Sequence, residues 1–440
     1  MGKPNRKHRA AKQQARQGGS DFWTAPDSGN VTAADIADAI MTTAMDSAQS
    51  GARSKSPKGD SVVAKRFAVA LAGSGLPVHE VELGAHLAGQ HIITRAFQNG
   101  WLPADIHQAA QRRVDTFAIS FLIDVMAAYI RPFAPATVDE TWLGQLRELA
   151  ADIWWSDSTS HLAQWAAKHM LTTAEALTTV IEALALLILL PKLELIRQLP
   201  GTARPHAEVP HHIDEKVLGR VRGLLAKAES TSFPEEAEAL SAKAQELMTK
   251  YALDRVLVDA GASVPDLPGA RRIWLETPYV DAKALLIDVV AKANRSRAIF
   301  ASAWGFMTIV GDDGDLEAVE LLSTSLLVQA TRAMIASGNT DTRSDEARSR
   351  TFRKSFLVAY ASRIGERLEA ATAATIAESV EPERLLPVLA SHQIAVDAAF
   401  DTLFPQARTR GVSIRSAEGW EAGRAAADRA RLDARRSLDR

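Results

Sequence analysis

Three side chains in the first quarter of the sequence are spaced like metal ligands. His79, Glu82 and His86 stand three and four residues apart, so they would share one face of a helix. Imidazole and carboxylate groups are ligands for Zn²⁺ or Fe²⁺. Two turns of one helix cannot complete a site, however, and the chain has no His-Glu-x-x-His motif. We therefore expect a polar helix face toward solvent here, and we predict no metal ion and no cofactor.

A second group of possible ligands is acidic. Asp312, Asp313 and Asp315 follow a β-rich run and precede a long helical pattern. A turn of this kind can hold phosphate at a helix start, but the aspartates would repel it and no Walker lysine is present. Capping of the helix by Asp312 or Asp313 is the simpler expectation. Mg²⁺ ligation by the three carboxylates is the alternative, and it would suit a metal-assisted phosphodiester hydrolase.

Basic side chains form a cluster at the N-terminus. Residues 1–20 contain several cations and no acidic residue, and they include Lys3, Arg6, Lys7 and Arg9. Such an arm binds a phosphate backbone favourably because it releases condensed counterions. A solvated, disordered tail is the competing interpretation of the same composition.

A second basic cluster lies in residues 343–367, which hold seven basic residues against three acidic ones. Arg343, Arg350 and Lys354 share one helical face at spacings of seven and four. This local excess of positive charge predicts a polyanionic partner better than the whole-chain charge does. A solvated helix paired with the aspartates of the previous loop is the alternative. The apolar stripe expected to face inward comprises Phe352, Phe356, Tyr360, Ile364 and Leu368.

The composition limits the classes of protein to which the chain can belong. Its 440 residues have a formal net charge of −2, so the molecule as a whole is not a polyanion binder by charge. Cysteine is absent, which excludes disulfides, thiolate metal sites and cysteine nucleophiles. The most apolar run, residues 180–190, is too short to span a bilayer. We expect a cytoplasmic protein of two or three domains without a membrane partner.

Two apolar stripes joined by a short turn predict an αα-hairpin over residues 213–251. The first helix has apolar residues at spacings of three and four, ending with Leu224, Leu225 and Ala228. Ser232 and Glu235 form a capping box that starts the second helix. In that helix the stripe continues through Ala237, Leu240, Ala244, Leu247, Met248 and Tyr251.

The hairpin resembles a known family. The stretch Lys216-Val-Leu-Gly-Arg220-Val-Arg222-Gly-Leu-Leu-Ala-Lys227-Ala-Glu229-Ser-Thr231, with the helix after it, is similar to the bacterial and phage family called domain of unknown function 2786. Residues 271–375 and the tail near 404–429 resemble the α/β region that often follows this domain. The resemblance implies a layout of domains and no particular reaction.

The outer face of the hairpin offers a third basic surface. Lys216, Arg220 and Lys227 line one side of the first helix, and Gly223 lies between them, where a second chain could approach closely. The carboxylates of the second helix favour a salt-bridged surface instead. Docking of a protein partner on the hairpin is a further alternative.

The remaining segments complete the predicted order of domains. Residues 1–30 form the basic arm, 31–200 a helical bundle, 201–212 a linker, 213–256 the hairpin, 257–270 a second linker, 271–408 an α+β domain and 409–440 a helical tail. In the bundle, helical patterns cover residues 62–72, 77–99, 104–130, 138–155, 160–169 and 173–190, with tryptophans as core or interface anchors. In the α+β domain, strands are predicted at 272–276, 297–302, 305–310 and 385–390.

The predicted fold class is therefore α+β and mostly α: a helical bundle, a central αα-hairpin, and a C-terminal domain with a small mixed sheet. No nucleophile–base pair or His–carboxylate triad can be identified from the sequence. Our first hypothesis is a non-enzymatic protein associated with DNA, RNA or nucleoprotein. A metal-assisted phosphodiester hydrolase and a protein–protein adaptor are the alternatives.

Overall fold

The computed structural model describes residues 31–53, 62–202, 215–231, 240, 243–251, 268–340, 350–377, 382–407 and 416–429. The chain divides into two compact units, Met1–His206 and Ala207–Arg440. The division falls within the segment predicted as the first linker. The fold is α+β and mostly α, as the sequence predicts.

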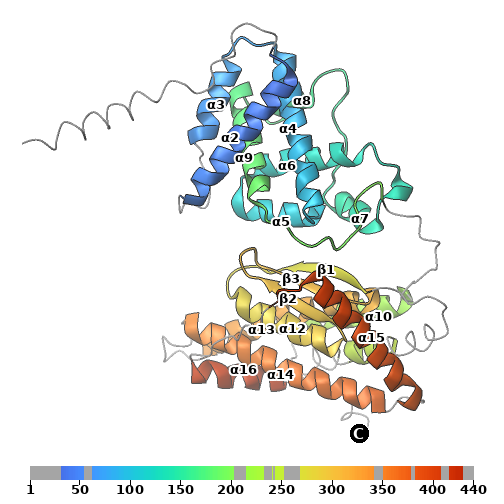
Figure 1. Ribbon diagram of the computed structural model, residues 1–440. Coiled ribbons are helices and arrows are strands. Elements are labelled where there is room, and N and C mark those ends of the chain that lie inside the picture. The colour runs from blue at the N-terminus through green and yellow to red at the C-terminus, as the bar shows by residue number, and fades with distance from the viewer. Residues whose placement is uncertain are drawn as a thin grey trace, which may run out of the picture. The chain divides into compact units, whose positions relative to one another are not determined.

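The N-terminal unit is a helical bundle (Figure 1). Helices α2, α4 and α9 pack against one another, and α9 is buried along most of its length. The apolar run of residues 180–190 is therefore core, as expected. The helices of this unit are α2 (Ala33–Arg53), α3 (Val62–Ala72), α4 (Val78–Gln98), α5 (Pro103–Arg113), α6 (Thr116–Ile130), α7 (Glu140–Glu148), α8 (His161–Lys168) and α9 (Thr173–Leu189), with the 3₁₀ turn Pro135–Thr137 between α6 and α7.

Capping side chains explain where several of these helices begin. The predicted helix 104–130 is in fact two helices, because the Asp115 carboxylate accepts a hydrogen bond from the Ala118 amide and starts α6. Ser160 caps α8 through the Ala163 amide in the same way. Caps of this kind fix the direction in which α6 and α8 present their side chains.

The C-terminal unit is built on a three-stranded sheet. Its order is β1-β3-β2, and both pairings are antiparallel. The prediction of a mixed sheet is therefore wrong. Every residue of the central strand β3 is buried. The elements are α10 (Glu215–Ser230), β1 (Gly269–Trp274), α12 (Val280–Ala293), β2 (Arg297–Ala301), β3 (Phe306–Gly311), α13 (Asp313–Thr340), α14 (Arg350–Ala377), α15 (Pro382–Leu403) and α16 (Ala417–Arg429).

Residues 385–390, predicted as a strand, lie inside helix α15. The run Leu385-Leu386-Pro387-Val388-Leu389 is too short for its periodicity to distinguish a strand from a helix. The proline lies inside the helix. The five residues are helical because they belong to the 22-residue helix Pro382–Leu403.

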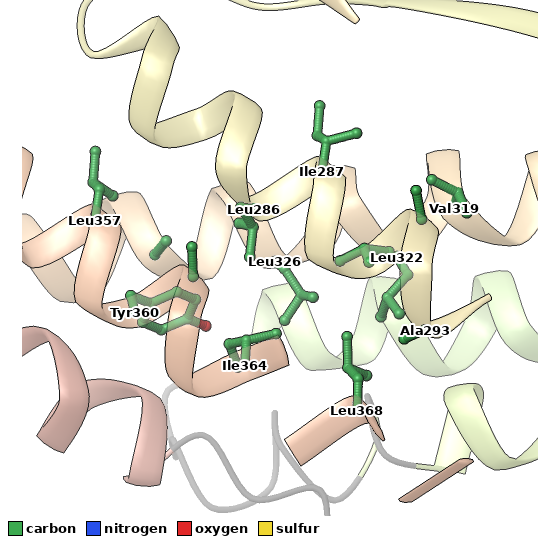
Figure 2. Close-up of a cluster of buried hydrophobic side chains, with 14 of the residues drawn as sticks. Leu286, Ile287, Ala293, Val319, Leu322, Leu326, Leu357, Tyr360, Ile364 and Leu368 are labelled. Atoms are coloured by element: carbon green, nitrogen blue, oxygen red, sulfur yellow. The ribbon is translucent and has the colours of Figure 1, made fainter. Parts of the chain in front are cut away.

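The core of the C-terminal unit lies between α12, α13 and α14. Figure 2 shows side chains from these three helices converging, among them Leu286, Leu322 and Ile364. All five members of the apolar stripe predicted for α14 are buried, which confirms that this face of the helix points inward. Helices α12 and α13 contact the sheet, and α14 packs against α12 on one side and α16 on another.

The predicted hairpin contributes to this same core. Val221 and Leu225 from α10, and Ala244 and Met248 from the helical segment 243–251, belong to the cluster that contains the α12, α13 and α14 side chains. A buried polar contact adds to the apolar packing. Gln245 Nε2 donates to Asn294 Oδ1 at the end of α12, over 3.2 Å.

The C-terminal helix α16 is docked along α14. Its glycines allow the close approach, because a Cβ at Gly419 would lie 2.5 Å from the Phe352 carbonyl oxygen and one at Gly423 would lie 2.2 Å from that of Phe356. The Glu366 carboxylate of α14 accepts hydrogen bonds from Arg424 of α16 and from Arg363. These two cations hold the pKa of Glu366 below its usual value.

No single helix among the described segments is long and apolar enough to cross a bilayer. The pair α8 and α9 meets the length and composition test only when taken together, with a bend of 106° between the two helices.

Candidate functional surfaces

The three possible ligands on α4 do not converge on one point. His79 is exposed and its Nε2 contacts the carboxylate of Glu80 at 3.2 Å. Glu82 is half-buried and His86 exposed along the same helix. Across the described part of the chain, no group of three histidine or carboxylate side chains is placed to hold a metal ion.

The aspartates at the start of α13 are engaged by cationic or imidazole side chains. The Asp312 carboxylate lies 2.9 Å from Nδ1 of His392 on α15. Asp315 is 7% exposed and forms a two-point ion pair with the guanidinium of Arg295. The Asp312 carbonyl also accepts the first helical hydrogen bond, from the Leu316 amide. These contacts tie α13 to α15 and to the turn before β2.

The basic face predicted on α14 is partly neutralised within the fold. Lys354 reaches Asp281 of α12 at 3.4 Å. Arg363 pairs with Glu366 and with Asp428 of α16, and Arg367 donates to the Ala427 carbonyl. Arg350, at the start of the helix, is exposed and forms no ion pair with the described residues. Positive charge is therefore free at the N-terminal end of α14.

Helix α10 presents a different kind of basic face. Gly219, Arg220, Gly223 and Lys227 are all exposed, and none of the exposed positions described on this helix is acidic. A Cβ added at either glycine would meet nothing within 4 Å, so the helix backbone itself is open to approach. Arg220 forms no ion pair with the described residues. Arg222, at the edge of this face, contacts Glu317 at 2.8 Å.

The other predicted nucleic-acid contacts lie outside the described residues. This applies to Lys3, Arg6, Lys7 and Arg9 of the N-terminal arm, to Arg343, and to the side chain of Lys216. The predicted capping residue Ser232 also lies outside them. Of the ten predicted contacts, Arg220, Lys227, Arg350 and Lys354 can therefore be placed.

Helices α6 and α8 bring together a polar cluster that the sequence analysis missed. Ser120 and Asp124 stand four residues apart on α6. His161 and Trp165 stand four apart on α8, and His169 caps its C-terminal end four residues later. The Ser120 hydroxyl lies 3.1 Å from Nε2 of His169 and accepts a hydrogen bond from Nε1 of Trp165 at 3.3 Å.

Asp124 occupies the inner end of the cluster. It is 5% exposed, and its carboxylate accepts hydrogen bonds from Nε1 of Trp154 at 2.9 Å and from Nε2 of His161 at 2.8 Å. Trp155 lies over the His161 ring with centroids 4.3 Å apart. Burial, followed by the neighbouring charge of Lys168, lowers the pKa of His169, while Asp124 opposes that shift.

The sequence contains one signal for this cluster, which is the four-residue spacing of polar and aromatic side chains on each of the two helices. Ser120 with Asp124, and His161 with Trp165 and His169, each mark one helical face. Nothing local shows that these two faces meet. The contacts join residues 37 to 49 positions apart in the chain, and only the packing of α6 and α8 creates them.

Comparison with known proteins gives one positive finding. Residues 216–255 match the model of a family described as a protein of unknown function, DUF2786. No curated protein and no solved structure matches the chain. The matched segment includes α10 from its second residue onward, with the exposed basic face described above, and the helical segment 243–251. The hairpin of this chain is thus similar to a domain whose function is unknown.

Proposed function

We propose that this protein binds nucleic acid in the cytoplasm, and that helix α10 and the N-terminal end of α14 contact phosphates. The observation that carries the proposal is the exposed face of α10. It carries Arg220, which is exposed and forms no ion pair with the described residues, and Lys227 is exposed seven residues later on the same helix. A helix that meets a polyanion through side chains needs exposed cations, and Arg220 is one that no described carboxylate neutralises.

The glycines strengthen this interpretation of α10. Arg220 and Lys227 stand about two helical turns apart, roughly 10 Å along the axis. Gly223 lies between the two cations and Gly219 lies just before Arg220, and both leave open space at the helix surface, so a sugar–phosphate chain could lie close to the helix while both cations reach it. Contacts of this type position a nucleic acid without reading its bases, so weak sequence preference is expected.

Arg350 supplies the second part of the proposed surface. It remains exposed, whereas Lys354, Arg363 and Arg367 farther along α14 contact acidic groups or a helix carbonyl. The proposal therefore assigns phosphate contact to the start of α14 and not to the whole basic segment. The arm residues Lys3, Arg6, Lys7 and Arg9 would add contacts of the same kind.

The hydrolase alternative has less support. Mg²⁺ ligation would require carboxylates that are free to turn toward the ion. Asp315 is buried against Arg295, and Asp312 faces His392. Both aspartates would have to give up these partners before they could bind a cation.

Titration of labelled duplex DNA, single-stranded DNA and RNA at three salt concentrations tests the proposal. Binding should weaken steeply with salt, at roughly 0.9 in log K per log[salt] for each duplex phosphate contact. The double substitution Arg220→Gln and Lys227→Gln should weaken binding to every sequence and lower this slope by about two. Arg350→Gln should lower it by about one.

A charge-matched control distinguishes local contact from loss of net charge. Arg131→Gln with Lys292→Gln also removes two cations, both exposed and both paired with carboxylates. This variant should bind nearly as wild type does. No binding at the lowest salt, or an equal loss in both double variants, would contradict the proposal. Binding of a protein through α10 that survives nuclease treatment would favour the adaptor alternative.

A further inference from the structure

The cluster between α6 and α8 contains a serine in contact with a histidine, Ser120 with His169, and a carboxylate, Asp124, that contacts a second histidine, His161. Ser120 is half-buried, and its Oγ lies 3.1 Å from Nε2 of His169. Trp165 donates its indole N–H to the same oxygen. Asp124 stands one helical turn from Ser120 and acts electrostatically on His169. Nothing in the proposed nucleic-acid surface uses these residues.

We propose that Ser120 is a nucleophile that accepts an acyl group from an ester, with His169 as its general base. A serine hydroxyl is a weak nucleophile unless a base within hydrogen-bonding distance removes its proton. Nε2 of His169 is at that distance. The Trp165 N–H donates to the same Ser120 oxygen, so it holds the hydroxyl in position beside His169.

The protonation state of His169 suits this role. A general base must be neutral before it can accept a proton. Burial and the positive charge of Lys168 hold the pKa of His169 below its usual 6.5, so the imidazole is neutral at pH 7. When the ring proton is on Nδ1, Nε2 accepts the Ser120 hydroxyl hydrogen. Asp124 favours the imidazolium that forms once the proton has moved.

The side chains beside the pair indicate the class of substrate. Phe117 is 38% exposed and stands edge-on to the His169 ring, with centroids 5.5 Å apart. Met170 follows His169 and is 91% exposed. Phe117 offers apolar surface beside the His169 ring and Met170 offers it at the residue after His169, which fits a small ester with an uncharged, apolar acyl group. Lys168 extends from the same end of α8, where its ammonium lies 3.9 Å from the Trp154 ring centroid.

The reaction balances with water as the second substrate. Ser120 Oγ attacks the ester carbonyl carbon while its proton moves to Nε2 of His169. The carbon–oxygen bond to the alcohol then breaks, and the departing alkoxide takes that proton. Water attacks the acyl-serine, giving a proton to His169 that returns to Ser120 Oγ as the carboxylic acid leaves. The net change is hydrolysis of an ester to an acid and an alcohol.

Labelling of the full-length protein with a fluorophosphonate, which reacts with activated serines, tests this proposal. Intact-mass measurement should show one adduct per chain, and peptide mapping should place it on Ser120. Ser120→Ala should abolish the adduct. His169→Gln should slow its formation at least tenfold, as expected for loss of a general base. The control Ser362→Ala, whose hydroxyl only donates to the Val358 carbonyl, should label as wild type does.

The pH profile separates catalysis from a structural role. The wild-type labelling rate should rise as His169 loses its proton and then become level, at a lower pH than for an ordinary imidazole because the pKa of His169 is lowered by burial, whereas His169→Gln should not show this step. Groups around His169 that also titrate or carry charge are Asp124, His161 and Lys168, and none is changed in this variant. No adduct, an adduct on another serine, or equal rates in wild type and His169→Gln would overturn the proposal. Because mapping uses the wild-type protein, misfolding of a variant cannot hide a negative result.

Discussion

The buried carboxylate of Asp124 joins three parts of the N-terminal unit through its hydrogen bonds. Its carboxylate is 5% exposed and has two donors, Trp154 Nε1 and His161 Nε2. The indole ring comes from the segment before α8, and the imidazole from the first residue of that helix. The carboxylate therefore fastens α8 and the preceding segment to α6.

Asp124→Asn should destabilise the N-terminal unit. An asparagine side chain offers one oxygen for two donors and points its own N–H₂ group at one of them. A buried donor left without its acceptor costs about 1–3 kcal/mol. Denaturant unfolding of the full chain, followed by tryptophan fluorescence, measures the change.

The exposed pair formed by Arg131 and Asp157 is the control for this variant. Asp157→Asn removes the same kind of contact at a position where both side chains are largely exposed to water. Exposed ion pairs contribute little, so its unfolding should match that of wild type. If Asp124→Asn unfolds like Asp157→Asn, the buried carboxylate does not fasten α8 to α6.

Helix α16 illustrates packing at the level of one element. Its contact with α14 depends on Gly419 and Gly423, four residues apart, which place backbone against backbone. The sequence Gly419-Trp-Glu-Ala-Gly423 supplies this spacing. Charged contacts from Arg363 to Asp428 and from Arg424 to Glu366 lie beside it.

Gly423→Ala should therefore destabilise the C-terminal unit. The new Cβ would lie 2.2 Å from the Phe356 carbonyl oxygen, and a backbone atom cannot move aside as a flexible side chain can. Overpacking of this kind costs typically 1–3 kcal/mol. Gly219→Ala in α10 is the matched control, because its Cβ would meet open space. That variant should gain about 0.5–1 kcal/mol from helix propensity. Equal effects in thermal unfolding would show that α16 does not pack closely on α14.

The whole chain is organised as two compact units, and the hairpin belongs to the second. Leu225 of α10 is 3% exposed, and it lies in one cluster with Ile364 of α14 and Leu286 of α12. A hydrophobic core shared in this way unfolds as one cooperative body. The hairpin should therefore not lose its structure independently of the sheet and its helices.

Core substitutions test this organisation directly. Leu225→Ala and Ile364→Ala should each lower the stability of one common unfolding transition, by about 2–5 kcal/mol. Ile93→Ala, in the core of the N-terminal unit, serves as the reference for the other unit, since Ile93 is fully buried there. Hydrogen exchange of the full chain follows each region separately. Protection lost only from α10 in Leu225→Ala, with α14 unaffected, would show that the hairpin folds as a separate body.

The sequence by itself determined which residues face inward. Val221, Leu225 and Ala228 in α10, and the stripe from Phe352 to Leu368 in α14, are buried as their spacing predicts, while Leu224 is partly buried. A stripe is a local property, because 3.6 residues per turn place neighbouring apolar side chains on one face whatever lies opposite. The helices α3 and α9 begin where the pattern of residues 62–72 and 173–190 predicts.

Only the tertiary structure decided which charges remain available and which polar groups meet. Arg363 and Lys354 belong to one predicted basic face, but Asp428 and Asp281, which are 65 and 73 residues away in the chain, engage them. Ser120 and His169, 49 residues apart, meet because α6 packs near α8. The types and the spacing of the side chains on one helix can be seen in its sequence. Which of them form ion pairs or hydrogen bonds depends on the face that a distant helix packs against them. The sequence contains no local signal for that face.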